Sequence, residues 1–334
     1  MISSSQFSQP LILSLPQHKT LAQKVAQKLQ IPYVSLEKCT FANSEIIVNA
    51  PITMRGKSVF LFHSMPNPVN ESIFELLIAI DGLRRAAVNS ISLIVPFLAY
   101  GRKEKKHNSR DPISAQLLAN LLTTAGAQRI ITINIHNPVI AGFYEIPFEN
   151  WNFFKVLLIT LLQTGLQNYV LASPDQSQIK PLKKLADMLD VPLVFCTKIR
   201  LAPNVSTVQS LVGDVKNRNV IFIDDMIDTG GTIVQAVQLA KKQGAHKVHI
   251  LTVHGIFSNN ALDKLSRLHQ QGLLEKMWVS DSLPLPSSIK EEKFLQIVSL
   301  DDFLSKMLRF YIECGCLSNY LNTEQQILQK LRHE

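Results

Sequence analysis

Residues 220–232 constrain the fold most, because signals for a strand, a loop and a helix follow one another without a break. Four apolar residues, 220–223, predict a buried strand, and the apolar periodicity from Ile233 to Ala240 predicts a helix directly after the loop. Asp224 and Asp225 are expected at the carboxyl end of the strand. Because open α/β sheets bind ligands beyond this end of their strands, the run predicts a ligand-binding edge.

The loop in this run has the composition of a sugar-phosphate site. Glycines let the backbone approach an anion closely, and amides at a helix start and Thr hydroxyls can donate to it. The two preceding carboxylates can accept hydrogen bonds from vicinal ribose hydroxyls. An ordinary strand, acidic turn and helix would account for a lone glycine pair but not for the full run. The loop residues are Asp228, Thr229, Gly230, Gly231 and Thr232.

The rest of the chain alternates strand-like and helical patterns, which favours an α/β fold with mainly parallel sheets flanked by helices. Its 334 residues suit two domains of roughly 150 residues each. A helix, a Gly-Ala turn and a strand recur in both halves, around residues 126–127 and 244–245, which suggests a duplicated fold. We expect domains at residues 1–150 and 151–311, followed by a C-terminal helix and tail at 312–334.

The expected elements are the following. Strands are predicted at residues 11–15, 45–48, 58–62, 92–96 and 129–133 in the first half, and at 169–172, 192–196, 220–223, 247–252 and 277–280 in the second. Helices are predicted at residues 20–29, 71–87, 113–125, 153–163, 179–189, 232–243 and 260–268, with a short one at 317–321.

Composition excludes several classes of function. The net charge of +8 could indicate nucleic acid, but the basic residues are scattered with little aromatic interleaving, so we expect no nucleic-acid partner. No apolar run reaches the roughly 20 residues of a membrane span, and no signal peptide is recognised. The four cysteines lack a zinc-like pattern and indicate reduced thiols, so we expect a cytoplasmic protein.

A second group of motifs lies in the first half. Residues 102–106 form a basic loop after a predicted strand, and residues 109–115 open a helix with Pro112 in its first turn. A solvated charged loop is the ordinary alternative for such a run. The position of the loop, at the carboxyl end of a buried strand, favours binding of a polyanion such as a nucleoside triphosphate.

Taken together, these motifs resemble those of ribose-phosphate diphosphokinases, the phosphoribosyl diphosphate (PRPP) synthetases. The run 220–232 resembles the PRPP-binding motif that they share with type I phosphoribosyltransferases. The other segments resemble the synthetases alone, and they occur in order over almost the full chain. These segments are residues 41–45, 54–57, 75–81, 109–115, 134–136, 142–150, 173–175, 203–205, 213–215 and 254–258.

The resemblance implies two tandem phosphoribosyltransferase-like domains. The first would carry the ATP side and the oligomer contacts, and the second would carry the ribose 5-phosphate loop. The implied reaction transfers diphosphate from Mg-ATP to O1 of ribose 5-phosphate and gives PRPP and AMP. The implied cofactor is Mg²⁺, the substrates are ATP and ribose 5-phosphate, and the implied assembly is a homo-oligomer, either a dimer or a hexamer.

The resemblance also implies roles for individual residues. For ribose 5-phosphate these are Asp224, Asp225, Asp228, Thr229, Gly230, Gly231 and Thr232, and for catalysis Lys198 and Arg200 of a mobile loop. For ATP they are Phe41, Asn43, Glu45, Arg102, Lys103, Glu104 and His136, and for the metal His136 and Asp175. An isolated histidine such as His136 is otherwise a structural residue by default.

Departures from the family pattern gather on the ATP and metal side. Lys103 replaces a Gln, Glu104 and Asn134 each replace an Asp, and residues 176–178 replace a small Ala-Gly-Gly stretch. Two alternatives therefore stay open beside the synthetase. One is a weak or inactive regulatory subunit that resembles PRPP synthetases. The other is a type I phosphoribosyltransferase, which would leave the first half of the chain unexplained.

Overall fold

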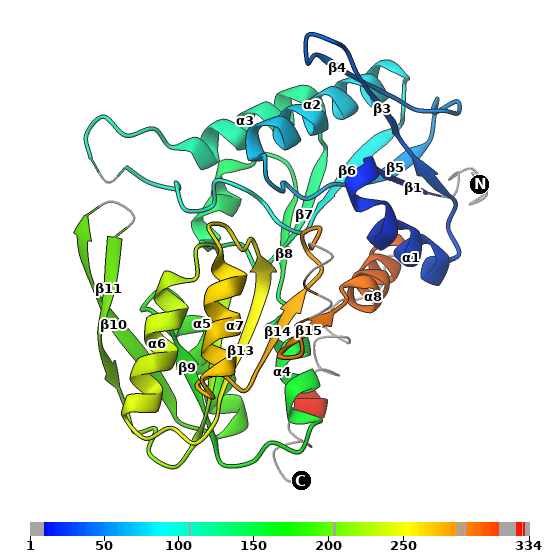
Figure 1. Cartoon of the computed structure of the whole chain (residues 1–334). Coiled ribbons are helices and arrows are strands. Elements are labelled where there is room, and N and C mark those ends of the chain that lie inside the picture. Colours follow the sequence, from blue (N-terminus) through cyan, green and yellow to red (C-terminus); the bar gives the residue numbers. More distant parts are fainter. Residues whose placement is uncertain are drawn as a thin grey trace. The chain divides into compact units, whose positions relative to one another are not determined.

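A computed structural model gives the fold of the chain in two compact units (Figure 1). It describes residues 10–106, 108–202, 205–285, 289, 292–313, 325–328 and 330. The side chains of residues 198–202, 205–207 and 209 lie outside this description.

The first unit is built on a six-stranded parallel sheet in the order β2-β1-β5-β6-β7-β8. The strands are short and mostly buried, as parallel sheets covered on both faces require. They are β1 (Leu11–Ser14), β2 (Tyr33–Ser35), β5 (Ser58–Phe62), β6 (Ser90–Val95), β7 (Arg129–Ile133) and β8 (Phe148–Trp151). The helices are η1 (Pro16–His18), α1 (Lys19–Leu29), α2 (Val69–Arg85), α3 (Ser114–Ala125) and η2 (Pro138–Phe143).

The first unit also contains a small antiparallel hairpin between β2 and β5. Its strands, β3 (Glu37–Thr40) and β4 (Ile46–Asn49), pair only with each other as a two-stranded sheet (Figure 1). The sequence pattern predicted β4 but not β3, because β3 is exposed along its whole length and shows no apolar alternation.

Helix α8 (Asp301–Ile312) belongs to the first unit although it follows the second in the chain. Phe303 meets Trp151 edge to face, and Arg309 Nη2 donates to the carbonyl oxygen of Lys28 at 3.0 Å. Lys28 in turn forms an ion pair with Asp302. The expected domain at residues 151–311 therefore differs from the structure at this end, because the apolar face of α8 packs on elements of the first half.

The second unit is built on a seven-stranded sheet in the order β11-β10-β9-β12-β13-β14-β15. Only β11 is antiparallel to its neighbour. The strands are β9 (Tyr169–Ser173), β10 (Leu193–Ala202), β11 (Val205–Val212), β12 (Asn219–Ile227), β13 (Val248–Gly255), β14 (Lys276–Ser280) and β15 (Leu295–Val298). The helices are α4 (Phe154–Leu162), α5 (Ile179–Leu189), α6 (Gly231–Lys242) and α7 (Ala261–Gln270).

Six strands follow the same spatial order in both units. In the first unit the order is β2-β1-β5-β6-β7-β8, and in the second it is β10-β9-β12-β13-β14-β15. In each unit the chain runs from the first strand through a helix to a strand that pairs on one side of it. The chain later crosses over and adds a strand on the other side of the first strand. The predicted α/β fold with two tandem domains of one kind is confirmed by this repetition.

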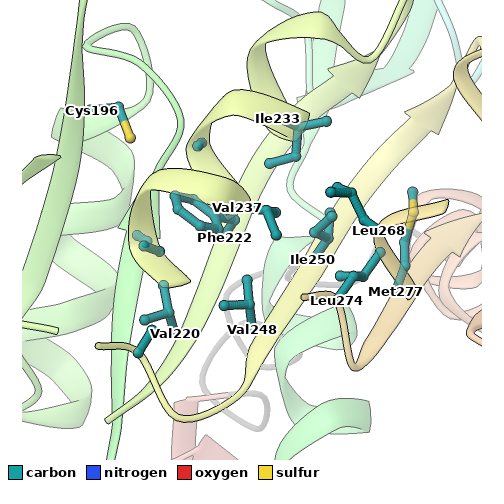
Figure 2. Close-up of a cluster of buried hydrophobic side chains, with 14 of the residues drawn as sticks. Cys196, Val220, Phe222, Ile233, Val237, Val248, Ile250, Leu268, Leu274 and Met277 are labelled. Carbon is teal, nitrogen blue, oxygen red and sulfur yellow. The ribbon is translucent and has the colours of Figure 1, made fainter. Parts of the chain in front are cut away.

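A dense apolar core fixes the strands that carry the phosphate-binding run. Figure 2 shows Phe222 of β12 and Ile250 of β13 packed with Val237 of α6 and Leu268 of α7. Each of these four side chains is at most 2% exposed. Burial of such a side chain is worth roughly 1.5–3 kcal/mol, so the end of β12 is held at a defined place.

The strands and helices predicted up to residue 280 are present, with two changes of length that concern function. Strand β12 runs to Ile227 instead of residue 223, and β10 runs to Ala202 instead of residue 196. The helix expected at 317–321 lies outside the described residues, whereas 325–328 are helical. Within the described part of the chain, no helix has both the length and the apolarity needed to cross a lipid bilayer.

Candidate functional site

The predicted phosphate loop, residues 228–232, joins β12 to α6 and lies at the carboxyl end of the second sheet. Gly230 is the N-cap residue of α6, in the left-handed region at φ 73°. An added Cβ at Gly230 would lie in ordinary contact with the Cβ of Ala261, at 3.4 Å, so it is the positive φ that favours glycine. An added Cβ at Gly231 would have open space around it. The nearest atom within 4 Å would be the Thr229 hydroxyl oxygen, 4.0 Å from that Cβ.

This arrangement has the features of an anion site. The first amides of a helix have no acceptor within the helix, and among the described residues no side chain caps the start of α6. Asp228 and Thr232 are half-buried, whereas Thr229 and Gly231 are exposed. Open amides, an exposed glycine and Thr hydroxyls at a helix start suit the binding of a phosphate group.

Asp224 and Asp225 lie within β12 and not after it, which corrects the expected strand end. Pairing with β13 continues past them, with Asp224 opposite Thr252 and Ile227 opposite Gly255. Their surroundings differ. Asp225 is only 2% exposed and accepts from the Gln178 side-chain amide at 3.3 Å, whereas Asp224 is half-buried and its Oδ1 accepts the Asp225 amide at 3.0 Å.

Asp175 lies after β9, the strand next to β12. Its Oδ1 accepts a hydrogen bond from the Ser177 amide at 2.8 Å, and the Ser173 hydroxyl donates to its backbone oxygen at 2.6 Å. The departures at residues 176–178 thus build a turn around Asp175 and bring Gln178 against Asp225. Both features lie at the same end of the second sheet as the phosphate loop.

In the first unit, the structure brings together two of the predicted ATP segments. Arg102, Lys103 and Glu104 follow β6, and His136 follows the neighbouring strand β7. An added Cβ at Gly101 would lie 3.3 Å from the Cβ of His136. Asn137 Nδ2 donates to Glu104 Oε1 at 3.1 Å, which links the two loops. Arg102 and Lys103 are exposed, and His136 is half-buried.

The third predicted ATP segment forms the turn of the β3–β4 hairpin. Phe41 is 52% exposed, and Asn43 and Glu45 are also exposed. The Asn43 side chain accepts from the Glu45 amide at 3.2 Å, which fixes the turn, and these three residues with Ala42 line a shallow hollow. An exposed aromatic ring beside polar groups can stack on a planar base.

Lys198 and Arg200, the predicted catalytic pair, lie on β10. Their backbones pair with Val208 and Ser206 of β11, and the register shifts on either side of them, between Thr197 and Lys198 and between Arg200 and Ala202. The predicted loop is therefore an irregular part of an edge hairpin. The side chains of Lys198 and Arg200 lie outside the described part of the structure.

The carboxylates at the end of the second sheet are candidate ligands for Mg²⁺. Among the described residues, no three His, Cys, Asp or Glu side chains are grouped so that they could hold a metal ion by themselves. Protein sites for Mg²⁺ usually supply one or two carboxylates and leave the other positions to water and substrate phosphates. Asp175, Asp224 and Asp225 at one sheet edge fit that pattern, so the chain suits a metal that binds together with its substrate.

Three contacting residues were missed by the sequence patterns. Gln178 holds Asp225, Asn137 holds Glu104, and Lys264 Nζ donates to the backbone oxygen of Thr229 at 2.8 Å. Each contact joins residues at least 33 positions apart. Of these three residues, only Gln178 had a signal in the sequence, because it departs from the family pattern.

The repeated sheet and the glycine-rich loop define a protein made of two phosphoribosyltransferase-like domains. Known sequences agree with this class. Residues 155–279 match the phosphoribosyl transferase domain, and residues 11–126 match the N-terminal domain of ribose phosphate pyrophosphokinase.

Relatives of known name extend the match over both halves. The ribose-phosphate pyrophosphokinase of Mycoplasma genitalium is 34% identical over 302 residues, which cover 90% of this chain and 91% of the relative. That of Bacillus cereus is 35% identical over 305 residues, covering 90% and 94%. The crystal structure of phosphoribosylpyrophosphate synthetase from Mycobacterium smegmatis superposes with a TM-score of 0.82 at 36% identity, covering 92% of this chain and 100% of that one.

The chain therefore belongs to the ribose-phosphate pyrophosphokinase family, as the motifs predicted. The family is one of enzymes that transfer diphosphate groups. A type I phosphoribosyltransferase is not favoured, because the N-terminal domain match belongs to the pyrophosphokinases. A regulatory subunit is not favoured either, since the relatives carry the enzyme's name.

Proposed function

We propose that the protein makes PRPP by transferring the β,γ-diphosphate of ATP to O1 of ribose 5-phosphate. The observation that carries the proposal is the match to ribose-phosphate pyrophosphokinases over both halves of the chain, at 34–35% identity. The phosphate loop supports it, because its glycine geometry and open helix start suit the 5-phosphate of the acceptor.

In the reaction, O1 of the sugar attacks the β-phosphorus of ATP. The bond from that phosphorus to the oxygen that bridges the α- and β-phosphates breaks, and AMP leaves with that oxygen. O1 loses its proton as the new bond forms. Because both substrates are polyanions, the main tasks of the protein are to position them and to neutralise the charge that develops.

For the acceptor, Asp228, Thr229, Gly230, Gly231 and Thr232 hold the 5-phosphate. Asp224 and Asp225 accept hydrogen bonds from the ribose hydroxyls. The fixed position of Asp225 against Gln178 supports this role, since a buried carboxylate with a defined orientation costs little to reorganise when the sugar binds.

For the donor, Arg102 and Lys103 supply positive charge to the triphosphate, and Glu104 orients their loop through Asn137. Phe41 stacks on the base, while Asn43 and Glu45 offer it hydrogen bonds. Lys198 and Arg200 act as the catalytic cations, on a strand whose register shifts on either side of them.

Mg²⁺ is the proposed cofactor, and His136 in the first unit and Asp175 in the second are each proposed as a metal ligand. When bound, it supplies positive charge to the phosphate oxygens. We also propose that the protein is a homo-oligomer, either a dimer or a hexamer, because the exposed Phe41 turn can then complete the donor site of a second copy. A cytoplasmic location accords with the need for ATP and with the free thiol of Cys39.

Phosphorus NMR of the purified protein with Mg-ATP and ribose 5-phosphate tests the proposal. We expect the resonances of AMP and PRPP to grow together, and we expect neither without ribose 5-phosphate. Formation of ADP in place of AMP would overturn the diphosphate transfer. Binding of ribose 5-phosphate without turnover, with ATP and with other nucleoside triphosphates, would point to the regulatory subunit instead.

A further inference from the structure

Helix α7 makes two contacts with the phosphate loop. Lys264 Nζ donates to the Thr229 backbone oxygen at 2.8 Å, across 35 positions in the sequence. One turn earlier on the same helix, Ala261 is fully buried and stands close behind Gly230. The loop is therefore supported from the side of α7 at two successive residues.

The lysine contact fixes the orientation of one peptide group. A peptide unit is planar, and in its trans form the C=O and the N–H point in opposite directions. Among the described residues, the cis peptide bond lies elsewhere, between Asn67 and Pro68. When Lys264 holds the Thr229 oxygen toward α7, the N–H of Gly230 must point away from α7.

This orientation matters because Gly230 is flexible by itself. A glycine adopts positive and negative φ at similar cost, so the 229–230 peptide could rotate without steric penalty from Gly230. A rotated peptide would turn its oxygen to where its N–H had pointed, and an oxygen repels a phosphate that an N–H would bind. The ammonium group of Lys264 opposes that rotation with a charge-assisted hydrogen bond.

We propose that Lys264 is a positioning residue for ribose 5-phosphate, which acts by holding the 229–230 peptide with its N–H available to the 5-phosphate. The inference rests on the proposed function of the phosphate loop. Lys264 itself acts through Thr229 and need not touch the substrate.

The test compares Lys264→Met with Arg267→Met, which removes an exposed cation one turn further along the same helix. Affinity for ribose 5-phosphate is measured by calorimetry on the full chain. We expect Lys264→Met to raise the Kd about tenfold, in the range of one lost hydrogen bond to a charged group. Arg267→Met should leave the Kd unchanged, and Lys264→Arg should restore most of the affinity.

Hydrogen exchange of residues 228–232 without ligand gives a second readout. The exchange should be faster in Lys264→Met than in the wild type and unchanged in Arg267→Met. Wild-type affinity and exchange in Lys264→Met would overturn the inference. An equal loss of affinity in both methionine variants would also overturn it, because net charge would then suffice. If the wild type neither binds ribose 5-phosphate nor forms PRPP, the proposed function fails, whereas the exchange experiment still tests the peptide contact.

Discussion

In each unit the strand order reverses between two neighbouring parallel strands. These strands are β1 and β5 in the first unit and β9 and β12 in the second. In open α/β sheets this is where a crevice forms at the carboxyl ends. In the second unit the strand ends carry Asp175, Asp225 and the phosphate loop. In the first they carry His18, His63 and Ser64, which are at most 4% exposed.

The side chains of the first unit hydrogen-bond with one another at this place, while among the described residues Nδ1 of His18 and Nδ1 of His63 have no partner. His18 Nε2 accepts from the Ser64 amide at 3.2 Å, and His63 Nε2 lies 2.9 Å from the Ser72 hydroxyl. The Ser64 hydroxyl accepts from the Phe97 amide at 3.2 Å. The same fold thus fills one switch point, the place where the strand order reverses, with buried side chains that hydrogen-bond one another. At the other it carries the glycine loop with the exposed Thr229 and Gly231. We call the first switch point closed and the second open. The strand order creates the crevice, and the side chains at the strand ends determine whether it is filled or can take a ligand.

The hairpins differ in a similar way. Each lies beside the second strand of its sheet in chain order: the hairpin follows β2 in the first unit and includes β10 in the second. In the first unit it is a separate sheet, β3–β4, with Phe41 at its exposed turn. In the second unit β11 extends the main sheet by pairing with β10, which carries Lys198 and Arg200. The duplicated position has therefore diverged into two different surfaces.

The largest expected effect tests the closed switch point of the first unit. Burial lowers the pKa of His18 to about 3, with a further contribution from His63, and lowers the pKa of His63 to about 4, from 6.5. Below pH 6.5 the unfolded chain takes up protons that the folded chain does not, so stability falls as the pH falls toward 4. Between pH 7 and pH 5 each histidine should cost about 2 kcal/mol, so the two together cost about 4 kcal/mol.

Urea unfolding of the full chain at several pH values measures this loss. In His63→Gln the fall in unfolding free energy from pH 7 to pH 5 should be smaller by about 2 kcal/mol, because one titrating group is gone. His249 of the second unit contributes with the same sign, since burial lowers its pKa to about 4, and it is present in both proteins. An identical pH dependence in the variant would show that the switch point does not hold His63 neutral.

The next effect tests the hairpin of the second unit. Lys198→Ala should lower kcat about 100- to 1,000-fold with little change in KM, because a cation that acts mainly in the transition state is lost. Steady-state kinetics of PRPP formation measure both constants. Lys183 of α5 offers a control, since it is exposed and forms an ion pair with Asp187, and Lys183→Ala should leave kcat nearly unchanged. Unchanged turnover in Lys198→Ala would end its assignment as a catalytic residue.

The smallest effect tests the open switch point. Asp228→Ala and Thr232→Val should each raise the KM for ribose 5-phosphate about tenfold, because each removes a polar group from the phosphate loop. Thr160→Val is the control, since the Thr160 hydroxyl donates to the Val156 oxygen within α4. If the loop variants match this control in KM, the phosphate is bound elsewhere.

The order of elements and the phosphate loop could be read from the sequence. The loop is contiguous, so strand, glycines and helix start appear together at residues 220–232, and their spacing reflects local backbone geometry. Strands β5 and β7 and helix α5 were predicted with the bounds that the structure gives. Exposed or very short strands such as β3 and β15 were missed, because an apolar pattern marks burial and not hydrogen bonding.

The sequence by itself therefore determined the class of fold, the family and the residue types of the phosphate loop. Only the tertiary structure decided that α8 completes the first unit, that Gln178 fixes Asp225 and that Lys264 holds Thr229. It also decided that the two equivalent switch points differ, one closed and one open. The physical reason is the separation of the residues along the sequence. Propensity and periodicity act within a few turns, whereas these contacts join residues from 35 to 281 positions apart.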